Sequence, residues 1–91
     1  METQDEFSNI VAKRLREARK KMGISQERLG VLAGIDEFSA SARINQYERG
    51  KHIPDLNTLE RLAAVLETPA PYFYAADQGL AEYILNYKPT K

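Results

Sequence analysis

Apolar residues that recur every three or four positions, in runs closed by glycine or proline, limit the folds open to this chain. Such spacing places the apolar side chains of each run on one face of a helix. Thr3 and Glu6 have the spacing of a capping box at the start of the first run, and Ser8 is a second candidate for its N-cap. Gly23 ends this run, because glycine adopts the left-handed conformation beyond a helix without steric cost. The apolar residues of this first helix are Phe7, Ile10, Val11, Leu15, Ala18 and Met22.

A second, shorter helix is expected to begin after Ser25, whose hydroxyl can accept a hydrogen bond from a free backbone N–H of the first turn. Gly34 ends this helix. Gly30 lies in its interior, where glycine costs about 1 kcal/mol relative to alanine, so we interpret it as a site of close approach by another helix. The residues expected to face inward are Leu29, Leu32 and Ala33.

The third helix is predicted over residues 40–49, with Ser39 as its N-cap and Ser41 as the alternative. Residues 35–38 form a connector ahead of it, and Phe38 is expected to pack back onto the core. Gly50 ends the helix. Its inward face comprises Ala40, Ile44 and Tyr47, whereas the residues that point away are Ser41, Ala42, Arg43, Asn45, Gln46 and Arg49.

Proline sets the limits of the fourth helix. Pro54 gives an extended entry, and Asp55 is placed to cap the helix. Pro69 and Pro71 prevent its continuation. The inward residues of this helix are Leu56, Leu59, Leu62, Ala63 and Leu66.

Two further segments follow, and no part of the chain has the alternation of a strand. Pro71 suits the first turn of a short helix over residues 70–75, and Asp77 can cap a last helix over residues 78–87. The chain is therefore expected to be all-α, with five or six helices. The last helix either docks onto the rest of the chain or forms a subunit interface, and we favour the interface. Its apolar stripe comprises Leu80, Tyr83, Ile84 and Tyr87.

Composition excludes several classes of protein. The 91 residues suffice for one domain with a modest core, expected to span residues 1–91. No run of about 18 apolar residues is present and the acidic N-terminus does not resemble a signal peptide, which predicts a cytoplasmic protein without a membrane span. The chain has no cysteine and one histidine, so we expect no metal and no other cofactor. His52 has no nucleophile or carboxylate pattern beside it, and we expect no enzymatic activity.

Charge is distributed unevenly along the chain, although the formal net charge is zero. Between Val11 and Lys51, ten Lys and Arg residues face five acidic residues, which leaves five surplus positive charges. The remainder holds three basic and eight acidic residues, which cancels that surplus. A local basic face can attract a polyanion despite zero net charge, and the alternative interpretation is an ordinary solvated surface.

Several elements at ordered spacings resemble a known family. They are the run RLREARKKMGISQERL from Arg14 to Leu29, the Ala33-Gly34-Ile35 turn, the run INQYERGK from Ile44 to Lys51, and Pro54 with the leucine-patterned helix after it. Together they resemble the phage-repressor-like helix-turn-helix proteins of the Cro/C1, or XRE, type. The resemblance implies a compact five-helix DNA-binding domain, usually dimeric, whose third helix enters the major groove. The helix-turn-helix core would lie at about residues 25–50, with an additional C-terminal helix in this chain.

The resemblance also implies roles for individual residues. Arg19 and Glu48 match a structural ion pair between the first helix and the end of the third. Gln26 matches a glutamine that contacts phosphate and buttresses the third helix. The base-facing positions are occupied by Ser41, Ala42, Arg43 and Gln46. Phosphate contacts are implied at Ser25, Gln26, Asn45, Arg49, Lys51 and His52.

The chain departs from the family between Gly34 and Glu48, where it has about four residues more than usual. We place the extra residues at 36–39, as a loop ahead of the third helix, because longer loops cost little in closure entropy. Arg43 and Gln46 remain the firmest candidates for base contacts, since they can pair with guanine and adenine respectively through two hydrogen bonds. The alternative is a solvent-exposed role for both, or a phosphate contact for Arg43.

These patterns predict a sequence-specific regulator of transcription that binds double-stranded DNA. The simplest form is a repressor that occupies a palindromic operator as a homodimer. Control would then come from a regulatory protein partner, proteolysis, dimer dissociation or the level of expression. The alternative is a helical protein-interaction module, or an antitoxin-like or controller protein, with weak or no specific DNA binding.

Overall fold

The computed structural model describes the backbone of residues 3–89 and the side chains of residues 9–89. Within that range it contains five α-helices, one 3-10 helix and no strand. This confirms the all-α fold expected from the sequence. In chain order the elements are α1 (Thr3–Met22), α2 (Gln26–Leu32), α3 (Glu37–Glu48), α4 (Leu56–Val65), η1 (Ala70–Tyr74) and α5 (Gln78–Asn86).

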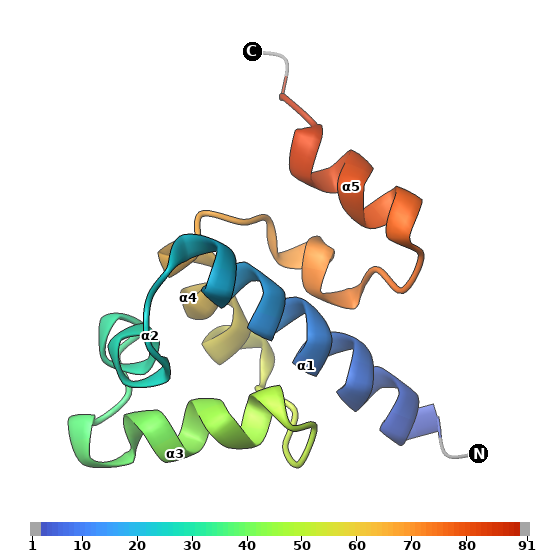
Figure 1. Cartoon of the computed structure of the whole chain (residues 1–91). Helices are drawn as coiled ribbons and strands as arrows, with labels where there is room; N and C mark the ends of the chain where they lie inside the picture. Colours follow the sequence, from blue (N-terminus) through green and yellow to red (C-terminus); the bar gives the residue numbers. More distant parts are fainter. Residues whose placement is uncertain (1–2, 90–91) are drawn as a thin grey trace.

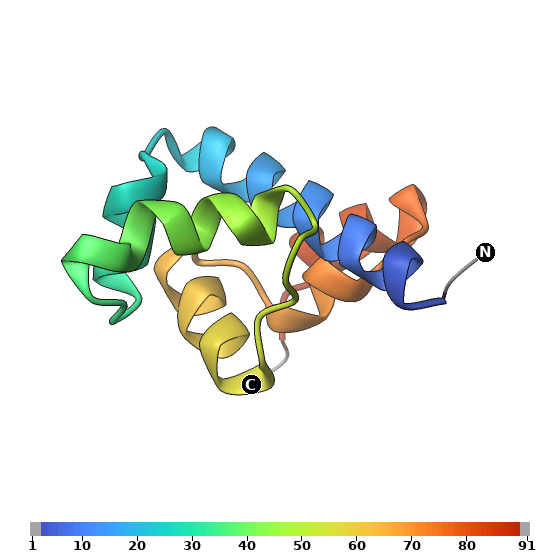
Figure 2. The same cartoon turned by 90° about the horizontal axis from the view of Figure 1, so that it is seen from below.

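The long helix α1 runs through the middle of the molecule and separates α3 from α5 (Figure 1). Seen from below, α3 lies across the side of the molecule opposite α5 (Figure 2). One core joins all the elements, because the apolar face of each helix packs against its neighbours. The large apolar side chains with no exposure come from α1, α2, α3, α4 and η1, and they are Leu15, Leu29, Ile44, Leu59, Leu62 and Phe73.

Side-chain caps begin three of the helices where the sequence predicts them. The Ser25 hydroxyl accepts from the backbone N–H of Arg28 at 2.9 Å, at the start of α2. Asp55 and Asp77 accept in the same way at the starts of α4 and α5, each at 2.8 Å. The hydrogen bonds that Asp55 accepts from Thr58 lower the pKa of its carboxyl. Local sequence therefore determines where these helices begin.

The first helix begins earlier than one of the two predicted starts. Because α1 begins at Thr3, Ser8 lies inside it and is not its N-cap. The predicted capping box of Thr3 and Glu6, and the predicted inward position of Phe7, lie outside the described side chains. Gly23 follows α1 with a φ of 79°, the left-handed conformation expected there.

The predicted start of the third helix is wrong. Asp36, and not Ser39 or Ser41, is the N-cap of α3, and its carboxylate accepts from the backbone N–H of Phe38 at 3.0 Å. Residues 37–39, which were expected to form a loop, therefore belong to the first turn of the helix. Close packing against α2 supports the longer helix, because a Cβ added at Gly30 would lie 2.7 Å from the Cβ of Ala40. The close-approach role predicted for Gly30 is confirmed.

The early start of α3 also reverses the prediction for Phe38. Phe38 precedes the buried Ala40 by two residues, and successive helical residues are about 100° apart, so its side chain points away from the core. It is 93% exposed, although the sequence suggested that it packs inward. Three other apolar residues expected to face inward are 38 to 65% exposed, and each lies in the first or last turn of its helix. They are Met22, Leu32 and Leu56.

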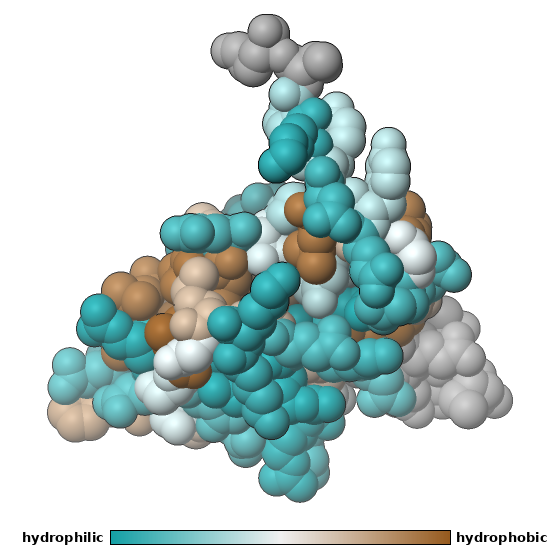
Figure 3. Space-filling model, turned by 45° about the horizontal axis from the view of Figure 1, so that its top comes forward, coloured by the Kyte–Doolittle hydropathy of each residue, from teal (hydrophilic) through white to brown (hydrophobic). Residues whose placement is uncertain are grey.

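The C-terminal helix both docks and exposes apolar surface. Ala81 is fully buried and Ile84 packs against the core at partial exposure. Leu80, Tyr83 and Tyr87 remain 50 to 67% exposed. Figure 3, with the α5 side turned forward, shows hydrophilic residues over most of this face and smaller hydrophobic groups. None of the helices described for residues 3–89 is long and apolar enough to span a membrane.

Candidate nucleic-acid interface

The two faces of α3 differ sharply in burial. Ala40, Ile44, Tyr47 and Glu48 are buried against the rest of the molecule. On the opposite side lie Ala42 and, one turn later, Gln46, with Ser41 and Arg43 on the two flanks of that strip. All four residues predicted to face bases are thus exposed on α3, and none of them is needed to fill the core. A rigid helix presents these side chains to solvent.

An ion pair between α1 and α3 anchors the C-terminal end of this helix. Arg19 donates from Nε to one carboxylate oxygen of Glu48 at 2.5 Å and from a terminal nitrogen to the other at 3.0 Å. The side chains are 13% and 3% exposed, so the pair is largely withdrawn from water. The hydrogen bond that Arg19 donates to Glu48 raises the pKa of Arg19 above its ordinary value. The structure thus brings together the two residues for which the family resemblance implied an ion pair.

Gln26, the first residue of α2, extends this network. Its amide nitrogen donates to Glu48 at 3.1 Å and to the side-chain oxygen of Asn45 at 3.3 Å. Both N–H groups of the Gln26 side chain are therefore engaged within the protein. The side chain buttresses α3, which holds the start of α2 against the C-terminal half of that helix.

Arg16 completes the anchor at a position that sequence reasoning did not single out. It donates from a terminal nitrogen to the backbone carbonyl of Glu48 at 2.9 Å. The last carbonyls of a helix carry partial negative charge and lack partners within the helix, so a cation is favourable there. Two arginines of α1 thus bind the same end of α3, one through a side chain and one through the backbone.

The residues expected to contact phosphate lie near the two ends of this network. Ser25 is exposed at the N-cap of α2, and Asn45 is half-buried, with its oxygen accepting from Gln26. Arg49, Lys51 and His52 are exposed in the segment that follows α3. The backbone N–H of Lys51 donates to the carbonyl of Gln46 at 2.9 Å, which turns this segment back beside the helix end.

Arg14 does not belong to the basic surface, although the charge count includes it. Its residue is only 1% exposed, and its guanidinium lies 5.4 Å from the centre of the Tyr72 ring. It donates at 3.0 Å to the backbone carbonyl of Ala75 and to the side-chain oxygen of Gln78. Arg14 therefore binds the segment between η1 and α5 to α1. Burial of Tyr72, together with the nearby Glu17 carboxylate, raises the pKa of its phenol.

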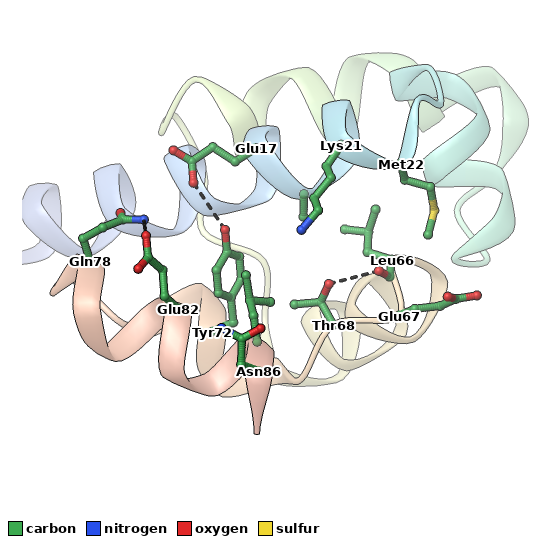
Figure 4. Close-up of a pocket in the computed structure, with 12 residues that line it drawn as sticks. Glu17, Lys21, Met22, Leu66, Glu67, Thr68, Tyr72, Gln78, Glu82 and Asn86 are labelled. Atoms are coloured by element: carbon green, nitrogen blue, oxygen red, sulfur yellow. Dashed lines mark hydrogen bonds between the residues drawn. The ribbon is translucent and has the colours of Figure 1, made fainter. Parts of the chain in front are cut away.

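A groove of about 640 Å³ lies beside α5, lined by α1, the end of α4 and η1 (Figure 4). The hydrogen bonds from Tyr72 to Glu17 at 3.3 Å and from Gln78 to Glu82 at 3.1 Å border it. None of the residues predicted to contact DNA lines this groove. Among the described residues, no group of three His, Asp or Glu side chains is placed to hold a metal ion.

Comparison with known proteins agrees with this geometry. A family model described as helix-turn-helix matches residues 15–73, which include α2, α3, α4 and most of η1. The crystal structure of the transcriptional regulator BswR superposes with a TM-score of 0.79 and is 51% identical in sequence. That match covers 86% of this chain and 80% of the other.

A second similarity concerns a much longer protein. Carbamoyl phosphate synthase large chain of Acidobacterium capsulatum is 35% identical over 71 residues, which is 77% of this chain. The chain spans only 6% of that protein's length. A likeness confined to so small a share of an enzyme implies nothing about that enzyme's reaction in this chain.

Proposed function

The chain belongs to the Cro/C1-type (XRE-type) family of helix-turn-helix proteins, and from that membership we propose that it is a sequence-specific, DNA-binding regulator of transcription. In its simplest form it represses by occupying a palindromic operator as a homodimer in the cytoplasm. We further propose that residues 1–91 act as one domain and that the chain is a regulator without catalytic activity.

The observation that carries this proposal is the exposed side of α3 on a helix fixed by a buried ion pair. A recognition helix must keep its side chains in register with base edges, and misplacement weakens hydrogen bonds that depend on distance and angle. Arg19, Glu48 and Gln26 fix α3 relative to α1 and α2. Base readout is assigned to the exposed residues Ser41, Ala42, Arg43 and Gln46.

The phosphate contacts follow from the donors that remain available around this helix. Ser25 uses its oxygen as an acceptor in the α2 cap, and its hydroxyl hydrogen can still donate. Asn45 likewise accepts with its oxygen, which leaves its amide hydrogens for a phosphate. The Gln26 side chain has both hydrogens engaged, so its phosphate contact would use its backbone N–H. Arg49, Lys51 and His52 would bind the DNA backbone beyond the end of α3.

Homodimerisation is proposed through α5. Leu80, Tyr83 and Tyr87 present exposed apolar surface on a helix that lies on the opposite side of α1 from α3. A second copy bound there would leave both recognition helices free. The two half-sites would then be centred about 34–36 Å apart, which is one turn of DNA, or a multiple of that distance.

The competing candidate is a protein-interaction module. The zero net charge of the chain and the exposed apolar residues of α5 favour it. Salt distinguishes the two, because each phosphate contact releases counterions and makes DNA affinity fall steeply as salt rises. A regulator should bind duplex DNA with that steep dependence, whereas an interaction module should not.

The proposal is tested by selecting bound duplexes from a random pool and then measuring variants on the selected sequence. We expect a palindrome, and we expect Arg43→Ala to relax the choice of base at one position of each half-site, at a cost of about 1–3 kcal/mol. Arg43→Lys keeps the positive charge but loses the planar pair of donors, so it should relax that position too. Lys88→Ala, beyond α5, is the charge-matched control and should leave the selection unchanged.

A random set of recovered duplexes would contradict sequence-specific binding. If Arg43→Lys behaved like the wild type while Arg43→Ala weakened binding to every sequence, Arg43 would be a phosphate contact and not a base reader.

A further inference from the structure

Phe38 is the most exposed of the large apolar side chains in the described part of the chain, at 93%. It lies in the first turn of α3, and Asp36 accepts a hydrogen bond from its backbone N–H at 3.0 Å. The ring is therefore carried by a capped helix whose first turn packs closely on α2 at Ala40. The helix therefore projects this aromatic ring into solvent, away from the core.

The position of Phe38 continues the strip that contains the predicted base readers. Phe38, Ala42 and Gln46 are separated by four residues each, which places them on one side of α3. From Phe38 to Gln46 the strip extends about 12 Å along the helix axis. Recognition helices contact base edges mainly through their N-terminal residues, and Phe38 occupies that end of α3.

The chemistry of this end of α3 favours an apolar contact over a phosphate contact. Asp36 and Glu37 place negative charge there, which disfavours a neighbouring phosphate. A phenylalanine ring offers no hydrogen bond, so the one feature that it can distinguish on a major-groove edge is the C5-methyl group of thymine. Ala42, one turn further along, is small and leaves room for that methyl group beside the ring.

We propose that Phe38 is a specificity-determining residue, whose ring contacts the C5-methyl group of one thymine in each half-site. This inference rests on the proposed function, because it requires α3 to enter the major groove. Base pairs stack about 3.4 Å apart, so the thymine should lie within about three to four base pairs of the base that Gln46 contacts. The residues inserted relative to the family would thus add a contact to the DNA interface.

The test combines a protein variant with removal of a single methyl group from the DNA. Each thymine of the selected duplex is replaced in turn by deoxyuridine, which lacks only the C5-methyl group. The dissociation constant is then measured for the wild type and for Phe38→Ala. At one thymine per half-site, we expect the replacement to weaken wild-type binding about fourfold, the factor for burying one methyl group, and to leave Phe38→Ala unaffected. The other thymines serve as controls within the same duplex.

Phe38→Leu is the matched variant, since leucine keeps an apolar side chain at this position. It should retain sensitivity to the same methyl group, and its melting temperature should equal that of Phe38→Ala because the side chain is exposed. If deoxyuridine weakened wild type and Phe38→Ala equally at every position, the assignment of Phe38 would be overturned. A wild type that selected no sequence would instead overturn the proposed function, so the two failures are distinct.

Discussion

Arg14 and Arg19 lie five residues apart on α1, and each binds a different part of the molecule to that helix. Arg19 binds the C-terminal end of α3 through the carboxylate of Glu48. Arg14 binds the segment between η1 and α5, mainly through backbone carbonyls, an amide oxygen and the face of Tyr72. One helix thus holds both the proposed DNA-binding region and the proposed dimer interface, and it does so with the same kind of side chain.

The two arginines differ in their binding partners and in how far those partners are exposed to water. The Arg14 residue is 1% exposed, and its one carboxylate partner, Glu17, has a side chain that is 45% exposed. Arg19 instead faces a carboxylate that is almost fully buried, while its own side chain keeps 13% exposure. Loss of Arg14 should leave the buried carbonyl of Ala75 and two partly buried acceptors without a donor. Loss of Glu48 instead leaves a cation that can still reach water. We therefore expect removal of Arg14 to lower the free energy of unfolding more than removal of Glu48.

Arg14→Ala should have the largest effect. Removal of a buried, hydrogen-bonded arginine leaves unpaired carbonyls and a cavity, and should lower the free energy of unfolding by about 3 kcal/mol. For a domain of this size that corresponds to a fall of roughly 15 °C in melting temperature. Hydrogen exchange of amides should accelerate in α5 before α3. Equal acceleration in both helices would contradict the separate roles of the two arginines.

Glu48→Ala should destabilise the protein by about 2 kcal/mol, because Arg19 and Gln26 lose the carboxylate that they share, although Arg19 can still reach water. Exchange should accelerate at the end of α3 and not in α5, and the duplex selected from a random pool should stay the same. Glu17→Ala is the control: its side chain is 45% exposed, so loss of its contacts with Arg14 and Tyr72 should cost less than about 1 kcal/mol. A Glu48 variant with unchanged melting temperature but altered sequence preference would reverse the assigned role.

Gly30→Ala tests whether close packing against α2, as well as the ion pair, holds α3 in position. The new Cβ would lie 2.7 Å from the Cβ and 3.1 Å from the Cα of Ala40, so one helix must shift. We expect a net loss of about 1 kcal/mol, although alanine has the higher helix propensity. Gly79→Ala in α5 is the comparison, because its Cβ would lie 3.2 Å from a single side-chain atom, the Oδ2 of the capping residue Asp77, which need move only slightly. The measurement is the melting temperature of each variant relative to the wild type. A Gly30→Ala variant that melts at a higher temperature than the wild type would contradict the close contact.

Local patterns in the sequence predicted most of the fold, because helix ends and apolar stripes depend on neighbouring residues. The caps at Ser25, Asp55 and Asp77 and the left-handed glycine after α1 follow from such patterns. The start of α3 did not, since Asp36, Ser39 and Ser41 all suit an N-cap. The contact between α2 and Ala40 supports the earliest start, and that contact joins residues from two helices.

The candidate site was predictable where the family resemblance supplied both partners, as for Arg19 and Glu48. Arg14 shows the limit of such reasoning. Its Nε donates to a backbone carbonyl 61 residues away, and a carbonyl is present at every position of the chain. Its position three residues after Val11 and four before Ala18 places it on the apolar face of α1, but no pattern in the sequence identifies the carbonyl that it binds. The exposure of Phe38 was missed for a related reason, because it depends on where α3 begins.

Comparison of affinity for the selected duplex and for a scrambled duplex of the same composition, at one physiological salt concentration, tests the central claim most directly. If the exposed side of α3 reads bases, the selected duplex should bind at least about a thousandfold more tightly. Equal dissociation constants for the two duplexes would contradict the claim, because phosphate contacts alone do not distinguish one sequence from another.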